Sequence, residues 1–144
     1  MSRIEELLNK GKLKKYTYSI EMCQKEFAVG RKDLEAAISS YEADNFKWAT
    51  IQAYYAIYHG VRALIFKSGY REESHAALKL SFKELYIEAG VLSHNVYKAL
   101  ERGMNLREMA DYKETYSQSG ASNLIEMVAK GLVEIEEELN QPTE

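Results

Sequence analysis

The residues best suited to chemistry include a short run at the end of one predicted helix, with Arg107, Asp111 and Tyr112 close together. A guanidinium could stabilise the negative charge of a phosphate, and a carboxylate could accept a proton. Tyrosine, with an ordinary pKa of about 10, is a poor base near neutral pH. Because Arg107 and Asp111 are four residues apart, they could also simply pair with each other on one helix face. The run therefore predicts either a structural ion pair or one wall of a ligand cleft.

A second group of candidates combines aromatic and basic side chains. Tyr54 and Tyr55 are neighbours in one helix and project about 100° apart, so at least one packs in the core while the other hydroxyl could line a cleft. His75 follows a serine placed to cap a helix, where the helix dipole favours a neutral imidazole, and Lys79 lies one turn later. Together with Arg107, these four residues are the ligand-binding candidates. Core packing and an internal hydrogen bond are the structural alternatives.

The motifs of several other chemistries are absent. The chain has no glycine-rich phosphate loop and no paired-cysteine or HExxH zinc spacing. Glu72 and His75 have the spacing of a two-metal helical site, but neither His59 nor His94 follows a second glutamate at that spacing. Cys23 lies on the apolar stripe of its helix and is expected to be a buried small residue. We therefore expect no metal and no cofactor.

The elements that position these residues are predicted to be helices, because apolar residues recur every three to four positions. The predicted helices span residues 2–15, 19–42, 45–68, 75–89, 94–111 and 118–140, and a polar loop is predicted at 70–74. The helix at 45–68 is apolar on most sides and should be the most buried. The expected fold is all-α: one domain over 1–144, an up-and-down antiparallel bundle of five main helices plus a short N-terminal helix.

The pattern also predicts which faces are buried and where helices begin. In the second helix, the predicted inner stripe consists of Ile20, Cys23, Phe27, Leu34, Ile38 and Tyr41. The predicted N-caps are Ser2, Asp44, Ser74 and Ser93. His59 and Arg62 are polar residues on the most apolar helix, so each needs an internal partner, a subunit interface or access to solvent.

Composition limits the classes of function. The formal net charge is −3, which gives no overall footprint of DNA binding. Lysines cluster near the start of the chain and glutamates near its end, where we expect two solvated helix ends. The single cysteine forms no internal disulfide, so the cytoplasm is the expected location. No apolar stretch is long enough for a spanning helix or resembles a signal peptide, so no membrane association is expected.

Three local patterns occur in a fixed order. The first is Ala53-Tyr54-Tyr55-Ala56-Ile57-Tyr58-His59-Gly60-Val61-Arg62-Ala63-Leu64, the second is Ser74-His75, and the third is Leu106-Arg107-Glu108-Met109-Ala110-Asp111-Tyr112. In this order, they resemble a group of prokaryotic proteins in the HEPN superfamily (higher eukaryotes and prokaryotes nucleotide-binding). The resemblance covers about residues 19–140.

This resemblance implies an up-and-down bundle of four or five helices that commonly forms a dimer. Many such proteins are encoded beside a minimal nucleotidyltransferase, often as toxin–antitoxin pairs. The active toxins are metal-independent ribonucleases, and their signature is an arginine followed by four to six residues and then a histidine. In the dimer, two copies of the signature meet in one cleft.

The signature is missing from this chain. An arginine would have to lie at 52–54, 68–70 or 87–89 to precede His59, His75 or His94 at the required spacing, and none does. After Arg107, Asp111 and Tyr112 stand where the histidine would be expected. This departure argues against ribonuclease activity.

The sequence therefore predicts a non-enzymatic HEPN-like binding or interaction module. It is expected to be a homodimer that works with a minimal nucleotidyltransferase, and a nucleotide or RNA is the expected ligand. One alternative is a divergent metal-independent ribonuclease toxin that uses Arg107 with Tyr112 or His75. Another is a nucleotide-binding regulatory protein.

Overall fold

The computed structural model describes residues 2–113 and 116–142, and the side chains of 109–115 lie outside the described set. The helices are α1 (Arg3–Asn9), α2 (Ile20–Glu42), α3 (Phe46–Lys67), α4 (His75–Phe82), the π-helical turn η1 (Lys83–Ile87), α5 (His94–Lys113) and α6 (Gln118–Leu139). The strands are β1 (Leu13–Lys15) and β2 (Tyr70–Glu72). The predicted all-α bundle is confirmed, with one small antiparallel sheet added to it.

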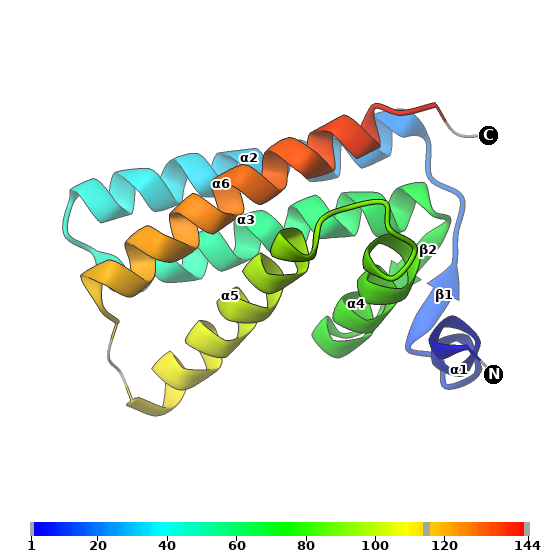
Figure 1. Cartoon of the computed structure of the whole chain (residues 1–144), viewed down its shortest axis with the longest axis horizontal. Helices are drawn as coiled ribbons and strands as arrows, with labels where there is room; N and C mark the ends of the chain where they lie inside the picture. The colour runs from blue at the N-terminus through cyan, green and yellow to red at the C-terminus, as the bar shows by residue number, and fades with distance from the viewer. Residues whose placement is uncertain (1, 114–115, 143–144) are drawn as a thin grey trace.

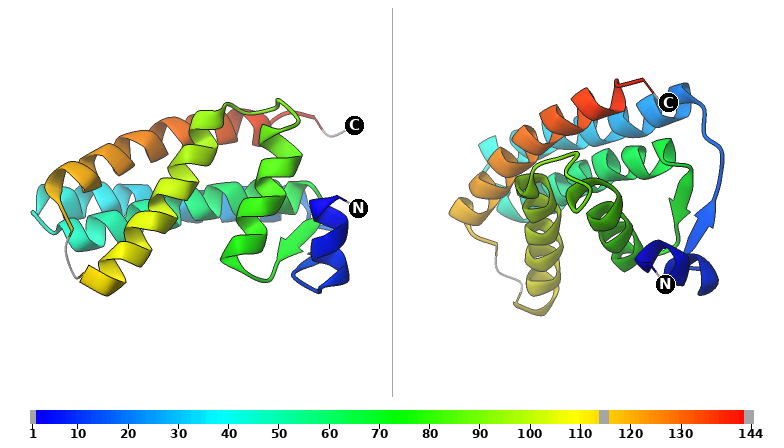
Figure 2. Two further views of the ribbon diagram at one scale, coloured as in Figure 1. Left: turned by 60° about the horizontal axis from the view of Figure 1, so that its bottom comes forward. Right: turned by 45° about the vertical axis from the view of Figure 1, so that its right-hand side comes forward.

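The long helices α2, α3 and α6 lie side by side, and α5 runs obliquely across them (Figure 1). Along the chain, the directions of α2, α3, α5 and α6 alternate, as expected for an up-and-down bundle (Figure 2). The two short strands and α1 lie at the end of the bundle where α6 finishes. This arrangement leaves α3 in contact with α2, α4, α5 and α6, so it is the central helix.

The buried face of α3 fits the prediction that this helix is the most buried one. Thr50, Ala53, Ile57, Val61 and Leu64 are all buried, as the helical period requires. The face rests on an unusually close approach between helices. A Cβ atom on Gly30 of α2 would lie only 2.6 Å from the carbonyl oxygen of Ala56 in α3. The absence of that atom lets the two backbones come into direct contact.

The prediction of which residues of α2 are buried is partly wrong. Cys23 and Phe27 are buried, but Ile20 and Ile38 are 47% and 40% exposed. Gly30 and Ala37 are buried instead. Helical periodicity predicted that large apolar residues would lie on the buried face. The close packing of α2 against α3 instead leaves room only for small residues there.

The N-terminal segment is shorter as a helix than predicted. α1 ends at Asn9, and residues 13–15, predicted to be helical, form β1. Gly11 has a φ of 69°, a conformation that interrupts a right-handed helix. β1 pairs with β2, with Leu13 opposite Glu72, so the predicted loop at 70–74 is also partly strand. The side chain of Leu13 is buried under this pairing.

Helix starts and breaks agree only in part with the prediction. The hydroxyls of Ser2 and Ser74 accept hydrogen bonds from the first turns of α1 and α4, as expected of N-caps. For α3 the cap is Asn45 rather than Asp44, which adopts a positive φ of 60°. The hydroxyl of Ser93, also a predicted cap, donates to the carboxylate of Glu134 at 2.8 Å.

The predicted helix 75–89 is divided by the π-helical turn η1, where the amide of Glu88 donates to the carbonyl of Lys83. In this turn, Tyr86 is buried, and its hydroxyl donates to the carbonyl oxygen of Leu64 at 2.9 Å. Burial raises the pKa of Tyr86 to about 12, so the hydroxyl remains a donor. The turn thereby attaches the end of this segment to α3.

Gly30→Ala is expected to lower the free energy of unfolding by about 1–3 kcal/mol relative to Gly131→Ala, because the added methyl group meets backbone atoms of α3. In Gly131→Ala, the nearest atom is the end of the Ile57 side chain at 3.2 Å, which can move. Both variants gain similar helix propensity, so the comparison isolates the packing effect. Urea denaturation measures it, and equal midpoints and slopes would contradict the close contact as the cause.

Candidate functional site

A pocket of about 480 Å³ lies between α3, α4 and α5. Four of the sequence candidates line it: Tyr54 from α3, His75 and Lys79 from α4, and Arg107 from α5. Tyr55 contacts the same arginine, as described below. Residues far apart in the sequence therefore meet at one place. The remaining pocket residues are Ala76, Met104, Asn105 and Glu108.

Tyr54 and His75 form the hydrogen-bonded floor of this pocket. The hydroxyl oxygen of Tyr54 lies 2.5 Å from Nδ1 of His75, and the tyrosine is 1% exposed. Burial raises the pKa of Tyr54 above its usual value. Burial, and then the nearby Arg107 charge, lower the pKa of His75, although Glu72 acts in the opposite direction. With the tyrosine protonated and the imidazole neutral, we infer that the hydroxyl donates to Nδ1.

Close passage of α5 over Tyr54 depends on a glycine. A Cβ atom on Gly103 would lie 2.9 Å from Cδ1 of Tyr54 and 3.4 Å from its Cα. The helix is continuous through this glycine. Its role is to allow α5 to lie directly against the tyrosine ring.

Arg107 covers the two neighbouring tyrosines. Its guanidinium carbon lies 5.7 Å from the centre of the Tyr54 ring and 5.1 Å from that of Tyr55, within the range of cation–π contacts. Tyr54 is buried and lines the pocket, whereas Tyr55 is half-buried and is not among the residues that line it. Asp111 and Tyr112 have side chains outside the described residues, and the ion pair between Arg107 and Asp111 stays a prediction.

Lys79 is held at the rim of the pocket by a neighbouring helix. Its Nζ lies 3.0 Å from a carboxylate oxygen of Glu101 and 5.7 Å from the ring centre of Tyr97. Burial opposes the charged form, but the hydrogen bond to Glu101 raises the pKa of Lys79. The ammonium therefore remains charged beside the pocket.

Sequence reasoning missed a buried carboxylate next to this site. Glu72, at the end of β2, has a side chain only 3% exposed and accepts a 2.7 Å hydrogen bond from the hydroxyl of Tyr58. Arg62 pairs with the same carboxylate at 3.1 Å. The ring of Tyr58 also lies 4.5 Å from that of His75, centre to centre. Glu72 was expected in a polar loop, and only its spacing to His75 had drawn attention to it.

The polar residues on α3 find partners within the chain. Glu26 of α2 lies 2.7 Å from Nδ1 of His59 and 3.6 Å from a guanidinium nitrogen of Arg62. Asp33 lies 3.8 Å from the other ring nitrogen of His59, and burial raises the pKa of Asp33 although His59 lowers it. Of the three explanations predicted for His59 and Arg62, the internal partner is therefore the one found.

No group of His, Cys, Asp and Glu side chains within residues 2–108 and 116–142 is arranged to hold a metal ion. Among the helices described, none is long and apolar enough to cross a membrane. Cys23 is buried as predicted, and burial raises the pKa of its thiol.

Comparison with known proteins gives a family match and two relatives. The family model described as HEPN domain matches residues 27–139. One relative from Methanocaldococcus jannaschii, named "Putative toxin MJ0605", is 27% identical over 64% of this chain and 69% of its own length. Another from the same organism, named "Putative toxin MJ0142", is 24% identical over 72% of this chain and 70% of its own length.

Arg107→Ala is expected to raise the pKa of His75 toward its usual value of about 6.5, because the variant removes a cation that disfavours the imidazolium. NMR titration of the His75 ring protons measures the change. Arg102→Ala is the matched control, since it removes the same charge from α5 on the side that faces α6.

The same lowered pKa makes stability depend on pH. As the pH falls below about 6.5, an unfolded chain takes up a proton on His75 before the folded chain does, so folding stability decreases there. The loss should be smaller in Arg107→Ala than in Arg102→Ala. An unchanged His75 pKa in Arg107→Ala would show that burial alone sets it.

Proposed function

Because the chain belongs to the HEPN family, we propose that it is a toxin-like HEPN module that binds RNA in the pocket between α3, α4 and α5 without cleaving it. In this proposal, it is a homodimer and works with a minimal nucleotidyltransferase. The family and the relatives named as toxins support the toxin-like class. RNA, homodimer and partner are the proposed refinements.

One observation carries the ligand part of the proposal: Arg107 and Lys79 reach the same pocket as Tyr54 and His75. A guanidinium and an ammonium can each bind a phosphate oxygen. Aromatic rings provide stacking surfaces for unpaired bases, as in many proteins that bind single strands. Lys79 is already paired with Glu101 at 3.0 Å, so Arg107 is the main cation for a phosphate, and Glu108 adds one opposing charge to the pocket.

Binding without cleavage is supported by the state of the candidate catalytic groups. Cleavage at a 2′-hydroxyl requires a base to remove its proton and a cation to stabilise the phosphorane. Tyr54 is a poor base because burial raises its pKa, and Nδ1 of His75 is already occupied by the tyrosine hydroxyl. The arginine–histidine signature of the active toxins is also missing.

Arg107→Ala is expected to weaken binding of a fluorescein-labelled single-stranded RNA by about tenfold or more, because the variant removes a charge-assisted contact and a stacking surface. Fluorescence anisotropy in EDTA measures binding, and a denaturing gel of the same samples detects cleavage. Arg31→Ala is the control, since Arg31 lies on α2 and pairs with Glu136 at 3.1 Å. Native protein that fails to bind RNA, or equal weakening by both variants, would overturn the proposal.

Cleavage in that gel would instead support a second candidate, a metal-independent ribonuclease. The observation favouring it is that His75 and Arg107 line one pocket despite their distance in sequence. In such a reaction, Nδ1 of His75 exchanges its hydrogen bond with Tyr54 for the 2′-hydroxyl and takes that proton, the 2′-oxygen attacks phosphorus, and the 5′-oxygen leaves with the proton that the imidazolium returns. The products are a 2′,3′-cyclic phosphate and a 5′-hydroxyl end. Loss of cleavage in both His75→Gln and Arg107→Ala would establish this reading.

The homodimer is proposed to form through the exposed side of α3. Trp48 is 49% exposed, and Ile51 and Tyr55 continue its face at intervals of three and four residues. Exposed aromatic residues on one face commonly mark an interface. This face ends at Arg107, which lies over the Tyr55 ring, so a second copy would approach the pocket. The nucleotidyltransferase partner is supported only by the family's gene arrangement.

Light scattering is expected to give twice the mass of the chain for the native protein and a single-chain mass for Trp48→Glu, because a buried unpaired carboxylate opposes association. Val133→Glu is the control, since Val133 is 59% exposed on α6. A minimal nucleotidyltransferase encoded next to this chain should raise the mass further when mixed with it. A native monomer would remove the homodimer from the proposal, and no such neighbour, or no mass increase, would remove the partner.

A further inference from the structure

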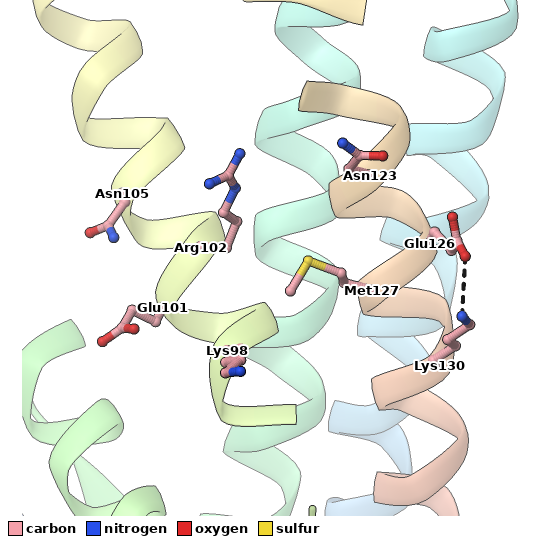
Figure 3. A pocket seen from close by; sticks show the side chains of 8 residues that line it. All are labelled: Lys98, Glu101, Arg102, Asn105, Asn123, Glu126, Met127 and Lys130. Atoms are coloured by element: carbon pink, nitrogen blue, oxygen red, sulfur yellow. Dashed lines mark hydrogen bonds and ion pairs between the residues drawn. The ribbon is translucent and has the colours of Figure 1, made fainter. Parts of the chain in front are cut away.

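A second hollow, of about 630 Å³, lies on the other side of α5, in the groove between α5 and α6. Figure 3 shows Arg102 extending from α5 toward α6 and Met127 extending from α6 toward α5. Lys98 lies one turn before Arg102 on α5, and Asn123 lies one turn before Met127 on α6. The groove thus has an apolar thioether between two basic side chains and a carboxamide.

The charges in this groove leave two cations available. Its carboxylates are both engaged, since Glu126 pairs with Lys130 at 3.1 Å and Glu101 pairs with Lys79 at 3.0 Å. Within the part of the chain that the structure describes, Lys98 and Arg102 form no ion pair. Both side chains are exposed and are four residues apart on one helix. An overall acidic chain therefore presents a local pair of unneutralised positive charges.

The groove and the pocket adjoin each other on α5, since they share a lining residue. Asn105 lines both hollows. Glu101 also joins them, because it lines the groove while its carboxylate holds Lys79 at the rim of the pocket. In Figure 3, Glu101 and Asn105 point to the side of α5 away from α6, and Arg102 points to the side facing α6. A ligand leaving the pocket over Asn105 would arrive beside Arg102 and Lys98.

We propose that the α5–α6 groove is a second binding site for single-stranded RNA, in which Arg102 and Lys98 hold successive phosphates of a strand that also occupies the pocket. This proposal rests on RNA being the ligand of the pocket. Basic side chains that follow a backbone, together with surfaces for base faces, are the usual design of sites for single strands. Here Met127 would contact a base. The side-chain amides of Asn105 and Asn123 would form hydrogen bonds with sugar hydroxyls or base edges, either as donors or as acceptors.

The distance along α5 sets the length of ligand required. From Lys98 to Arg107, the helix rises by about 14 Å at about 1.5 Å per residue. A strand advancing about 3.4 Å per nucleotide needs about four nucleotides to run beside it. A ligand of one or two nucleotides can therefore fill only the pocket, whereas a longer strand can reach both sites. The proposal predicts that affinity rises with RNA length because of the groove.

The test compares a labelled RNA dinucleotide with an RNA of about a dozen nucleotides, using anisotropy at several salt concentrations. In Lys98→Ala/Arg102→Ala, the longer RNA should bind about tenfold more weakly than to the native protein. The slope of the logarithm of the association constant against the logarithm of the salt concentration should become shallower by about 1.4. This change corresponds to two lost phosphate contacts on a single strand. Binding of the dinucleotide should be unchanged.

Lys25→Ala/Lys32→Ala is the matched control, because it removes two exposed lysines from α2 and changes the net charge equally. Circular dichroism checks that each variant keeps its helices, which alanine favours. Equal binding of the longer RNA by the groove variant and the native protein would overturn the groove site, and so would equal weakening by the control. If Arg107→Ala binds the longer RNA normally while the groove variant does not, the pocket site fails and with it the strand that spans both sites, although the groove would still bind RNA by itself. If the native protein binds neither RNA, both proposals fail.

Discussion

The structure depends on enclosing α3 on nearly all sides. A helix whose side chains are apolar around most of its circumference is stable in water only if other elements cover it. Here α2, α6, α5 and α4 provide the cover, and α2 comes closest because Gly30 has no side chain to separate the backbones. Polar groups on the covered sides of α3 must therefore find partners inside the protein, since little solvent reaches those sides.

The need for internal partners determines which polar side chains lie together around the pocket. The hydroxyl of Tyr58 and the guanidinium of Arg62 share the buried carboxylate of Glu72, and the hydroxyl of Tyr54 is taken up by His75. A buried charge without its partners is strongly destabilising, so β2, which carries the carboxylate, is held against α3. Because α4 begins three residues after Glu72, the same contact fixes where His75 enters the pocket.

The features predictable from the sequence are those that depend on local periodicity and capping. The burial of α3, the caps at Ser2 and Ser74, and the choice of Tyr54, His75 and Arg107 as candidates all follow from residue type and spacing. Features set by distant partners were missed. Glu72 looks like a loop residue until Arg62 is beside it, and residues 13–15 become a strand only because residues 70–72 pair with them. Likewise, Lys98 and Arg102 line a groove only because α6 packs beside α5.

The π-helical turn η1 changes the direction in which side chains leave the segment formed by α4 and η1. A π turn inserts one extra residue into an otherwise α-helical path, and this shifts the angular phase of everything beyond it by about 100°. Without that shift, His75 and Tyr86, eleven residues apart, would share one side of a continuous rod. Tyr86 lies inside the turn and therefore takes up part of this shift, while His75, before the turn, is unaffected by it. The imidazole contacts Tyr54 and the phenol contacts the carbonyl of Leu64, so the segment is attached to α3 near both of its ends and resists rolling about its own axis.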